Sequence, residues 1–475
     1  MRNLTLLTDL YQLTMGQGYF NAGKHEQRAV VDVFFRPNRL ITYSVAAGTE
    51  QAAEYLENLH FDGDDIAYLR SLGMFSEEYL AYLAQLRFTG DVRAVREGEI
   101  VFPYEPILTV SAPMLEAQLV ETALLTFINH QTLIASKAAK ICAAAGGGVM
   151  EFGLRRAQGA DAGVYGARAA IIGGCVGTSN VYAGKLFSVP VSGTMAHSWV
   201  MNFPSELEAF RAYARSFPDN CLLLVDTYDT LRSGVPHAIQ VFRELRESGY
   251  EPKGIRLDSG DLAYLSKKAR KMLDEAGFPD AVICASGDLD ETLIRSLKAQ
   301  GACIDTWGVG TKLITSADMP ALGGVYKLAA VYEDGKEIPK IKLSDTTEKI
   351  TNPGVKEVYR IYDAATDKAI ADLIVRAGET IDEGKPLTIF HPVDTWKRMT
   401  IEHFRVRNLR EDLFRNGKRV APVRPLSEIA AYRAGEQARF WEEYLRQDMP
   451  HIYKVDLSAA LHKLKQGLVE AFGAR

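Results

Sequence analysis

The feature that most constrains this fold is a regular alternation of short apolar runs and helical patterns between about residues 140 and 335. The apolar runs predict strands at 149–152, 170–176, 189–195, 221–225, 254–257, 281–285, 303–307 and 325–331. Helical patterns lie between several of these strands. Because parallel strands need a crossover connection, which is usually a helix, the alternation predicts a parallel sheet.

Seven or eight such repeats within about 190 residues favour a TIM-like (β/α) barrel, which makes this an α/β protein. The alternative is an open doubly wound sheet, in which a G-x-G-x-x-G loop commonly follows an early strand. No such loop follows an early strand here, so we favour the barrel, in an irregular form.

Start and stop signals define some of the intervening helices. Ser205 and Glu208 form a capping box, in which side chains satisfy the free N–H groups of the first turn. Asp288 precedes another helical pattern, and glycines follow the ends of two. The helices predicted from these signals are 205–217, 262–276 and 289–300.

The 475 residues are too many for one compact core, so several domains are expected. We predict an α+β N-terminal domain at 1–135, the barrel at 136–345 and an appended C-terminal domain at 346–475. In the last of these, 357–363 and 369–375 resemble paired strands and 458–472 an amphipathic helix.

Composition excludes several classes of protein. The net charge is −5 and no basic block is present, which argues against nucleic-acid binding. No apolar segment has the length of a membrane span, and the first 20 residues lack the pattern of a signal peptide. The five cysteines are scattered singly, which fits free thiols in a reducing compartment. We therefore expect a cytoplasmic enzyme of small molecules.

Polar and glycine residues gather wherever a predicted strand ends, at 153–156, 177–180, 193–198, 226–229, 256–261, 286–288 and 308–312. In a barrel, all these loops converge on one rim, where barrel active sites are built. A single strand-end aspartate or serine is more often a helix cap than a catalytic group. Capping does not explain Arg155, His197 and Arg256, so the set as a whole indicates an active site.

The residue types at this rim suit a phosphorylated ligand. The G-V-G-T run at 308–311 exposes backbone N–H groups as a phosphate cradle does, although a tight turn explains it equally well. Arg155, Arg156 and Arg256 supply planar cationic donors for phosphate or carboxylate. The strand-end carboxylates suit either Mg²⁺ or ribose hydroxyls, and they are Asp226, Asp229, Asp258 and Asp288.

His197 lacks a second histidine or a cysteine at ligand spacing, which argues against zinc. The sequence also lacks a Walker A loop, since the G-K-L run at 184–186 has a leucine after the lysine. Any ATP that binds must therefore use another geometry. From the residues alone, we infer an enzyme that acts on a multiply phosphorylated small molecule with Mg²⁺.

Five motifs, in order along nearly the whole chain, resemble those of nicotinate phosphoribosyltransferases. They are T-D-L-Y-Q-L-T-M at 8–15, E-F-G-L-R-R-A-Q-G at 151–159, G-T-M-A-H-S at 193–198, R-L-D-S-G-D-L at 256–262, and G-V-G-T at 308–311 followed by L-G-G-V-Y-K-L at 322–328. The resemblance is weakest beyond about residue 365. It implies a type II phosphoribosyltransferase that joins nicotinate to phosphoribosyl pyrophosphate, with Mg²⁺ as cofactor and ATP as co-substrate.

The resemblance also implies a homodimer with shared active sites, in which Tyr11 comes from the partner subunit and encloses the pyridine ring together with Phe152. Arg155 and Arg256 would lie near the carboxylate and the phosphates, and Asp258 near the ribose. The residues implied to cradle the 5′-phosphate are Gly287, Asp288, Gly308, Gly310 and Thr311, and further substrate-binding positions are Thr194, Asp226 and Ser286. Arg36 is a further candidate for phosphate binding across the interface.

Two positions carry finer implications of the resemblance. His197 matches the histidine that this family phosphorylates with ATP, which couples ATP hydrolysis to product formation. Ser179 stands where the sister family that acts on nicotinamide carries an aspartate. An aspartate repels a carboxylate, whereas a serine hydroxyl donates to it, so Ser179 favours nicotinate as the base.

Four alternatives stay open. A type I phosphoribosyltransferase has paired acids and then a Thr-Gly loop after a strand, which the run 225–229 resembles only superficially. A quinolinate-type enzyme shares this architecture but is typically much shorter than this chain. A barrel lyase or aldolase would require a Schiff-base lysine or a metal-binding histidine set at the strand ends, and neither is visible. A non-catalytic protein would bind phosphoribosyl pyrophosphate without turnover, which the full set of polar loops makes a poor explanation.

Overall fold

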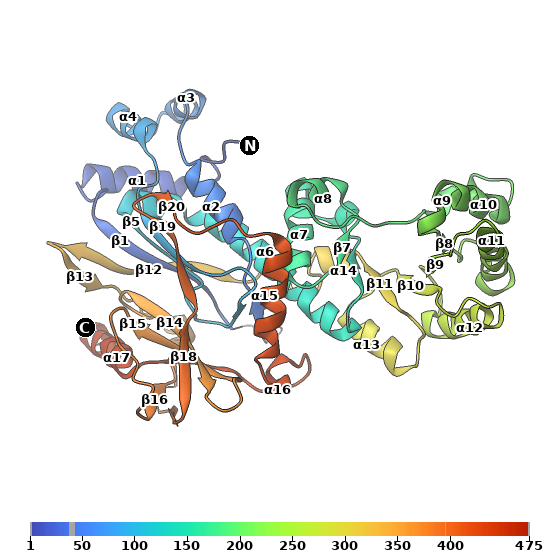
Figure 1. Ribbon diagram of the computed structural model, residues 1–475. Coiled ribbons are helices and arrows are strands. Elements are labelled where there is room, and N and C mark those ends of the chain that lie inside the picture. Colours follow the sequence, from blue (N-terminus) through green and yellow to red (C-terminus); the bar gives the residue numbers. More distant parts are fainter. Residues whose placement is uncertain (1, 38–42, 395, 474–475) are drawn as a thin grey trace. The chain divides into compact units, whose positions relative to one another are not determined.

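The structure is a computed structural model that describes residues 2–37, 43–394 and 396–473 (Figure 1). The described chain divides into two compact units. The first unit combines residues 1–133 with 321–475, and the second is formed by residues 134–320. No helix in the described ranges is both long enough and apolar enough to cross a membrane.

The second unit is built on a parallel sheet. Its strands, in chain order, are β6 (Val149–Glu151), β7 (Gly177–Thr178), β8 (Leu222–Leu224), β9 (Gly254–Leu257), β10 (Val282–Ser286) and β11 (Thr306–Val309). They pair in the spatial order β7-β6-β11-β10-β9-β8, and every named pair is parallel. Apolar residues make up most of these strands because both faces of a parallel sheet are covered. Figure 1 shows β9, β10 and β11 side by side.

A closed barrel is not found in this unit. The strand order is cyclic, with the last strand β11 beside the first strand β6, as in a barrel. Within the described residues, however, no pairing joins the end strands β7 and β8. The sheet is therefore open between them, and the prediction of a parallel α/β sheet holds while the prediction of an eight-stranded barrel is not confirmed.

Three of the predicted strands were wrong in place or in kind. Residues 170–172 end helix α7 (Ala160–Ile172) and 173–176 form the turn that follows it, because a buried alanine-rich run suits a helix as well as a strand. Residues 189–195 form only an isolated bridge at Val191, since Pro190 lacks an N–H to donate. Residues 325–331 do form a strand, β12 (Gly324–Glu333), but it pairs antiparallel with β1 (Arg28–Phe35) in the first unit.

Helices connect the parallel strands much as the sequence predicts. They include α10 (Glu206–Ser216), α11 (Val235–Glu247), α12 (Leu262–Glu275), which packs on β9 and β10 (Figure 1), and α13 (Glu291–Ala299). The Ser205 side chain caps α10 as expected. Helix α13 starts later than predicted, because Asp290 rather than Asp288 accepts the capping hydrogen bond, from Leu293 N–H at 2.8 Å.

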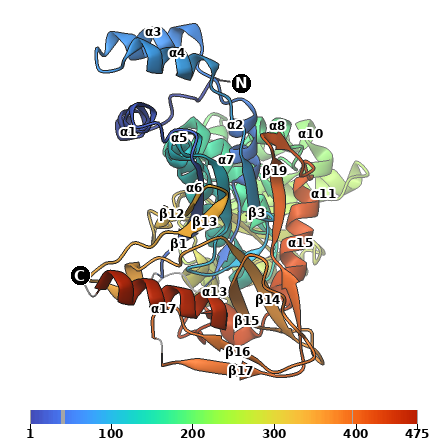
Figure 2. The same cartoon turned by 90° about the vertical axis from the view of Figure 1, so that its left-hand side faces the viewer.

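The described part of the first unit contains one short pair of strands, β2 (Ser44–Val45) with β4 (Ile100–Val101), and two larger sheets. One is antiparallel, in the order β13-β12-β1-β5-β3-β19-β20, and joins β3 (Asp91–Val95) and β5 (Leu108–Pro113) to β19 (Arg410–Arg415). Its remaining strands are β13 (Lys336–Pro339) and β20 (Lys418–Arg419). Strand pairing therefore links the two ends of the chain. Helix α1 (Leu10–Asn21) packs on α5 (Met114–Leu119), and α3 (Gly63–Ser71) packs on α4 (Glu77–Gln85), as Figure 2 shows.

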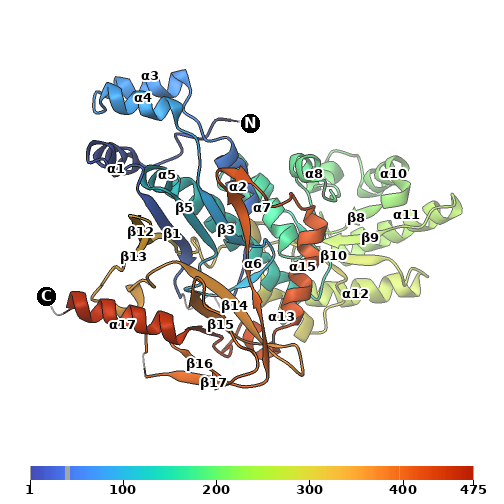
Figure 3. The ribbon, with the colours of Figure 1, turned by 60° about the vertical axis from the view of Figure 1, so that its left-hand side comes forward.

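The other sheet has the order β17-β16-β21-β15-β14-β18. The predicted pair of strands is confirmed as β14 (Lys356–Asp363) and β15 (Ala369–Arg376), which are antiparallel. The other strands are β16 (Leu387–Phe390), β17 (Arg398–Ile401), β18 (Phe404–Asn408) and β21 (Lys454–Leu457). The predicted C-terminal helix is α17 (Ala459–Gly473), which packs on β15 and β16 (Figure 3).

A buried ion cluster ties this sheet to the earlier part of the chain. Arg360 of β14 is fully buried and donates to both Asp372 carboxylate oxygens, at 2.8 and 2.7 Å. It also donates to Glu99 at 2.5 Å, just before β4 (Ile100–Val101). Burial alone would lower the pKa of Arg360, but the charges of Asp372 and Glu99 raise it well above its usual value.

Candidate active site

The predicted site residues of the second unit lie where its parallel strands end. Phe152 directly follows β6, Arg256 is part of β9, Asp258 directly follows β9, and Ser286 ends β10. Because neighbouring parallel strands end at the same edge, these side chains meet there. Ligands of open α/β sheets bind at this carboxyl edge.

Arg256, Asp258 and Ser286 form one hydrogen-bonded network. The Arg256 guanidinium donates to Ser286 Oγ at 2.8 Å and to Asp258 Oδ1 at 2.7 Å, and the Ser286 hydroxyl also donates to Asp258. Burial alone would raise the pKa of Asp258, but the Ser286 hydrogen bond and the Arg256 charge hold it below its usual value. The network therefore presents an ionised carboxylate beside a fixed cation.

His197 lies at the start of α9 (His197–Met201), beside this network. Its Nδ1 lies 3.1 Å from Thr227 Oγ1, and its Nε2 lies 3.8 Å from Asp258 Oδ2. The side chain is 39% exposed, so one side of the ring is accessible. An imidazole held between a hydroxyl and a carboxylate is suited to accept or transfer a charged group.

Asp226 supports the backbone that carries Asp258. Its Oδ2 accepts from the Asp258 N–H at 2.9 Å and from the Ser259 hydroxyl at 2.6 Å. Its Oδ1 is buried and has no hydrogen-bond partner within the described structure. A buried carboxylate oxygen without a donor carries a desolvation cost, which makes it a ready ligand for a cation or a hydroxyl.

The Phe152 ring occupies the space over Gly308 of β11. A Cβ at Gly308 would lie 2.6 Å from two carbons of that ring, so any larger residue there would have to displace the ring. The Phe152 N–H donates to the Val309 carbonyl at 2.8 Å, which fixes the backbone, and the Arg256 guanidinium carbon lies 5.8 Å from the ring centroid. The ring is thus held at the strand ends, near the charged network.

The loop after β10 approaches the loop after β9 closely. Gly287 has a φ of 93°, and a Cβ there would lie 2.3 Å from the Asp258 carbonyl oxygen. Asp288 also has a positive φ, of 38°, and its side chain is exposed. Gly310 and Thr311 lie at the start of the short helix α14 (Thr311–Ile314), on the neighbouring strand end.

Several predicted residues are not joined to this network. Arg155 and Arg156 are exposed on the 3-10 turn Leu154–Arg156. The Thr194 oxygen accepts from the next N–H in the chain, and Asp229 accepts from the Leu231 and Arg232 N–H groups as a cap.

Two further candidates, Tyr11 and Arg36, belong to the first unit. Tyr11 lies on α1 and is 47% exposed, and Arg36 directly follows β1.

Two polar residues at these strand ends were missed by the sequence analysis. Thr227 directly follows Asp226 but was passed over in favour of the carboxylates around it. Glu151 ends β6 fully buried, and its carboxylate accepts from Thr178 Oγ1 at 2.6 Å and from the Gly153 N–H. A charged residue that closes an apolar strand was the available signal for Glu151.

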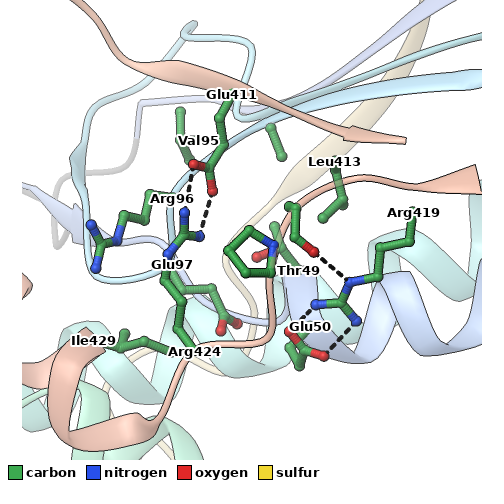
Figure 4. A pocket seen from close by; sticks show the side chains of 13 residues that line it. Thr49, Glu50, Val95, Arg96, Glu97, Glu411, Leu413, Arg419, Arg424 and Ile429 are labelled. Carbon is green, nitrogen blue, oxygen red and sulfur yellow. Dashed lines mark hydrogen bonds and ion pairs between the residues drawn. The ribbon is translucent and has the colours of Figure 1, made fainter. Parts of the chain in front are cut away.

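The first unit contains a small pocket between β3, β19 and the start of α2 (Thr49–Glu57), which Figure 4 shows. Its cations are already paired. Arg419 binds Glu50 at 2.7 Å through both nitrogens, and Arg424 binds Glu411 at 2.6 and 2.8 Å (Figure 4). Because these guanidinium groups are neutralised, the pocket lacks the free charge that a phosphate ligand would need.

Comparison with known proteins agrees with the motifs. Sequence models of the nicotinate phosphoribosyltransferase family match residues 6–129 as the N-terminal domain, 148–366 as the family region and 355–465 as the C-terminal domain. Nicotinate phosphoribosyltransferase of Bacillus subtilis is 51% identical over 458 residues, which cover 96% of this chain and 93% of that protein.

Two solved structures are similar in fold. The crystal structure of human nicotinic acid phosphoribosyltransferase has a TM-score of 0.85 at 30% identity and covers 97% of this chain and 99% of its own. Nicotinate-nucleotide pyrophosphorylase of Pyrococcus furiosus has a TM-score of 0.69 at 22% identity, with 92% and 96% covered. With half of its residues identical to a named relative over almost its full length, this chain belongs to the nicotinate phosphoribosyltransferase family.

Proposed function

We propose that this chain transfers the phosphoribosyl group of 5-phosphoribosyl 1-pyrophosphate to nicotinate, which yields nicotinate mononucleotide and pyrophosphate for NAD biosynthesis. The family relationship supports this reaction. The observation that carries it at the level of residues is the Arg256–Asp258–Ser286 network beside Phe152 at one edge of the sheet. It supplies a cation for phosphate, a carboxylate for ribose and an aromatic face for a flat base.

The transfer is a displacement at C1 of the ribose. The pyridine nitrogen forms a bond to C1 as the bond from C1 to the pyrophosphate oxygen breaks, and the bonding electrons leave with pyrophosphate. Positive charge develops on the ribose in the transition state. The ionised carboxylate of Asp258 stabilises that charge, and Arg256 stabilises the charge on the departing oxygens.

The other site residues bind and orient the substrates. Phe152 stacks on the pyridine ring from one side, and the partner subunit's Tyr11 covers the other, which requires a homodimer. Arg155 and Ser179 receive the nicotinate carboxylate. The 5′-phosphate binds at the loops after β10 and β11, through Gly287, Asp288, Gly308, Gly310 and Thr311, with Thr194, Asp226 and Ser286 at the ribose and pyrophosphate.

Mg²⁺ fits this site as a cofactor carried by the substrate. No cluster of three or more metal-binding side chains occurs among the described residues, so an all-protein cage is absent there. Asp226 does offer a buried carboxylate oxygen without a partner, next to Asp258. These two residues would hold the ion, which would supply positive charge to stabilise the departing pyrophosphate.

His197 couples the reaction to ATP in this proposal. A ring nitrogen attacks the γ-phosphate, ADP leaves with the bonding electrons, and hydrolysis of the resulting phosphohistidine releases phosphate. Asp258 and Thr227, which flank the ring, orient it. The charge of a phosphate on His197, close to Asp258, would alter the adjacent site and thereby link the two reactions. A cytoplasmic location agrees with these substrates.

The proposal is tested by measuring mononucleotide formation from phosphoribosyl pyrophosphate and Mg²⁺, with nicotinate, nicotinamide or quinolinate, each with and without ATP. We expect turnover of nicotinate only, enhanced by ATP. Two results would overturn the proposal: product formed from quinolinate, or no product formed from any of the three bases.

The role of His197 has a matched control in His237, a histidine of the same unit whose Nδ1 lies 2.8 Å from Glu206. We expect His197→Asn to lose both acid-labile phosphate incorporation from ATP and the ATP enhancement, while His237→Asn keeps both. Equal behaviour of the two variants would argue against a phosphohistidine at His197.

The choice of base is tested with Ser179→Asp. A carboxylate at this position repels nicotinate and accepts from an amide, so we expect the preference to shift toward nicotinamide. A like-charge contact costs on the order of 1–3 kcal/mol, or about five-fold to 150-fold in relative kcat/KM. An unchanged preference for nicotinate would refute the assignment of Ser179.

A further inference from the structure

Glu151 is a buried carboxylate that the reaction as proposed does not use. It ends β6 and is fully buried, yet both of its oxygens accept from uncharged donors, namely Thr178 Oγ1 at 2.6 Å and the Gly153 N–H. A buried charge held only by neutral donors is costly compared with an apolar residue. The groups to which Glu151 is hydrogen-bonded therefore have to explain why a carboxylate stands at this position.

Glu151 is hydrogen-bonded to a sequence neighbour of each of the two residues assigned to the base, Phe152 and Ser179. Its side chain bonds the residue directly after Phe152 and the residue directly before Ser179. Its own carbonyl accepts from the Ser179 N–H at 2.9 Å. One residue thus connects the strand end that carries Phe152 to the strand end that carries Ser179.

The network fixes the chemistry that this position requires. Thr178 Oγ1 already accepts from the Asn180 N–H at 3.0 Å, so its hydroxyl hydrogen points to Glu151. Asn180 in turn caps α8 (Val181–Phe187) through the Ala183 N–H at 3.0 Å. Glu151 therefore faces two donors and must accept from both. A carboxylate does this, whereas the amide of glutamine presents one acceptor and one donor.

We propose that Glu151 is a positioning residue for base recognition, which sets the separation of Phe152 and Ser179 and so determines affinity and selectivity for the pyridine base. This inference rests on the proposed function, because it takes those two residues as the base-binding pair. It distinguishes the base from the phosphoribosyl group, whose expected contacts Arg256, Asp258 and Ser286 lie at β9 and β10. Strand β11 pairs with β6, but the Glu151 side-chain hydrogen bonds go to Gly153 and Thr178 and to none of the residues assigned to the phosphoribosyl group.

The test compares Glu151→Gln with wild type in the full-length protein, by steady-state kinetics in each substrate. Loss of one hydrogen bond to a charged group predicts a rise of about ten-fold or more in KM for nicotinate. We expect KM for phosphoribosyl pyrophosphate to change less than about two-fold, because its residues keep their partners. Selectivity for nicotinate over nicotinamide should fall as well.

A pH profile separates positioning from simple stabilisation. Burial raises the pKa of Glu151, against the opposing effect of its Thr178 and Gly153 donors. As the pH falls through that raised pKa, a protonated Glu151 accepts from one donor fewer, so KM for nicotinate rises in the wild type. Glu151→Gln lacks the titrating group, and its KM should lose this dependence on pH.

Glu291→Gln is the matched control, since Glu291 is another buried carboxylate of the same unit, paired with Lys137 at 2.8 Å. We expect it to lower Tm with no change in KM for nicotinate. If Glu151→Gln does not fold, Thr178→Val removes one of the two donors with little change of volume and should raise the same KM. In that case, KM for nicotinate in the Thr178→Val variant is the measurement that tests the proposal.

The outcomes separate the two proposals. A wild type that does not turn over nicotinate overturns the proposed function. A wild type that does, together with Glu151 and Thr178 variants that lose only kcat at unchanged KM for nicotinate, overturns the positioning role and leaves the function standing. A selective rise in that KM supports both.

Discussion

Replacing Gly308 by alanine tests directly whether the Phe152 ring is the base-binding surface. The added Cβ would lie 2.6 Å from two ring carbons, whereas ordinary contacts begin at 3.4 Å. The ring must therefore retreat by 3.4 − 2.6 = 0.8 Å at least. Because the Phe152 N–H is bonded to the Val309 carbonyl, the displacement falls on the side chain rather than on the backbone.

The cost of this displacement can be placed within limits. Overpacking of a buried position costs about 1–3 kcal/mol, which corresponds to about five-fold to 150-fold in an equilibrium constant. Gly308 does not have a positive φ, so alanine adds no backbone strain. We expect KM for nicotinate to rise within that range, and KM for phosphoribosyl pyrophosphate to rise less, because the second contact of the new Cβ, at Ser286, is an ordinary 3.4 Å.

The assay is steady-state kinetics in both substrates with a double-mutant cycle. Phe152→Ala removes the ring, so adding Gly308→Ala in that background should change KM for nicotinate by less than about two-fold. Thermal unfolding of each variant shows whether the effect reflects loss of folded protein. The reasoning is refuted if Gly308→Ala costs the same with and without the ring, or leaves KM for nicotinate unchanged.

Two further predictions concern stability. Arg360→Met removes the cation between the buried carboxylates of Glu99 and Asp372, so it should destabilise the first unit by about 3–5 kcal/mol in chemical denaturation. The control Arg446→Met, at an exposed ion pair, should cost under about 1 kcal/mol. Equal losses of stability in the two variants would contradict the role of the buried cluster. Burial lowers the pKa of Lys465 to about 8, so between pH 8 and its unfolded pKa the unfolded chain binds a proton that the folded chain does not, and stability rises with pH. Relative to Lys465→Met, the wild type should therefore gain about 2 kcal/mol between pH 7 and 10, and a constant difference would show that Lys465 titrates normally.

The sequence predicted the strands whose apolar runs end sharply in polar residues. The runs that end at Phe152, Val225, Leu257 and Ala285 were placed within a residue or two of β6, β8, β9 and β10. In such runs, the strand residues are apolar because the sheet is buried, and the residues after them are polar because they line the site. The change from apolar to polar therefore shows where the strand ends. Residues 170–176 lack this contrast, because alanine and glycine fit a buried helix equally well.

Strand partners were not predictable in the same way. The run at 325–331 is a strand in its own right, but its neighbour in space is β1, almost 300 residues earlier in the chain, where Val33 pairs with Tyr326. The pattern of a half-buried strand states which face is buried and not which strand lies beside it. The assignment of this strand to the parallel sheet therefore failed although its limits were nearly right.

The candidate site divides in the same manner. Arg256 and Asp258 stand two apart at the end of β9, in nearly extended chain, so their side chains point to the same face and their contact follows from local geometry. The contact of His197 with Thr227 joins the start of α9 to a residue 30 positions later, beyond the end of β8, and no spacing rule implies it. Sequence reasoning thus finds the residues that a strand end presents, and misses the pairs that tertiary structure alone brings together.

This division bears on how the proposed reaction can be altered. The residues assigned to phosphoribosyl transfer are fixed by regular strands and by one another, as Ser286 bonds both Arg256 and Asp258. The residues assigned to base choice and to ATP coupling, Ser179 and His197, lie beyond the ends of shorter or irregular segments. A substitution in the strand-borne network removes a charge that its neighbours require, whereas one in the loops changes what the site accepts and leaves the network intact. We therefore expect substitutions in the loops to change the choice of base, and substitutions in the strand-borne network to reduce kcat.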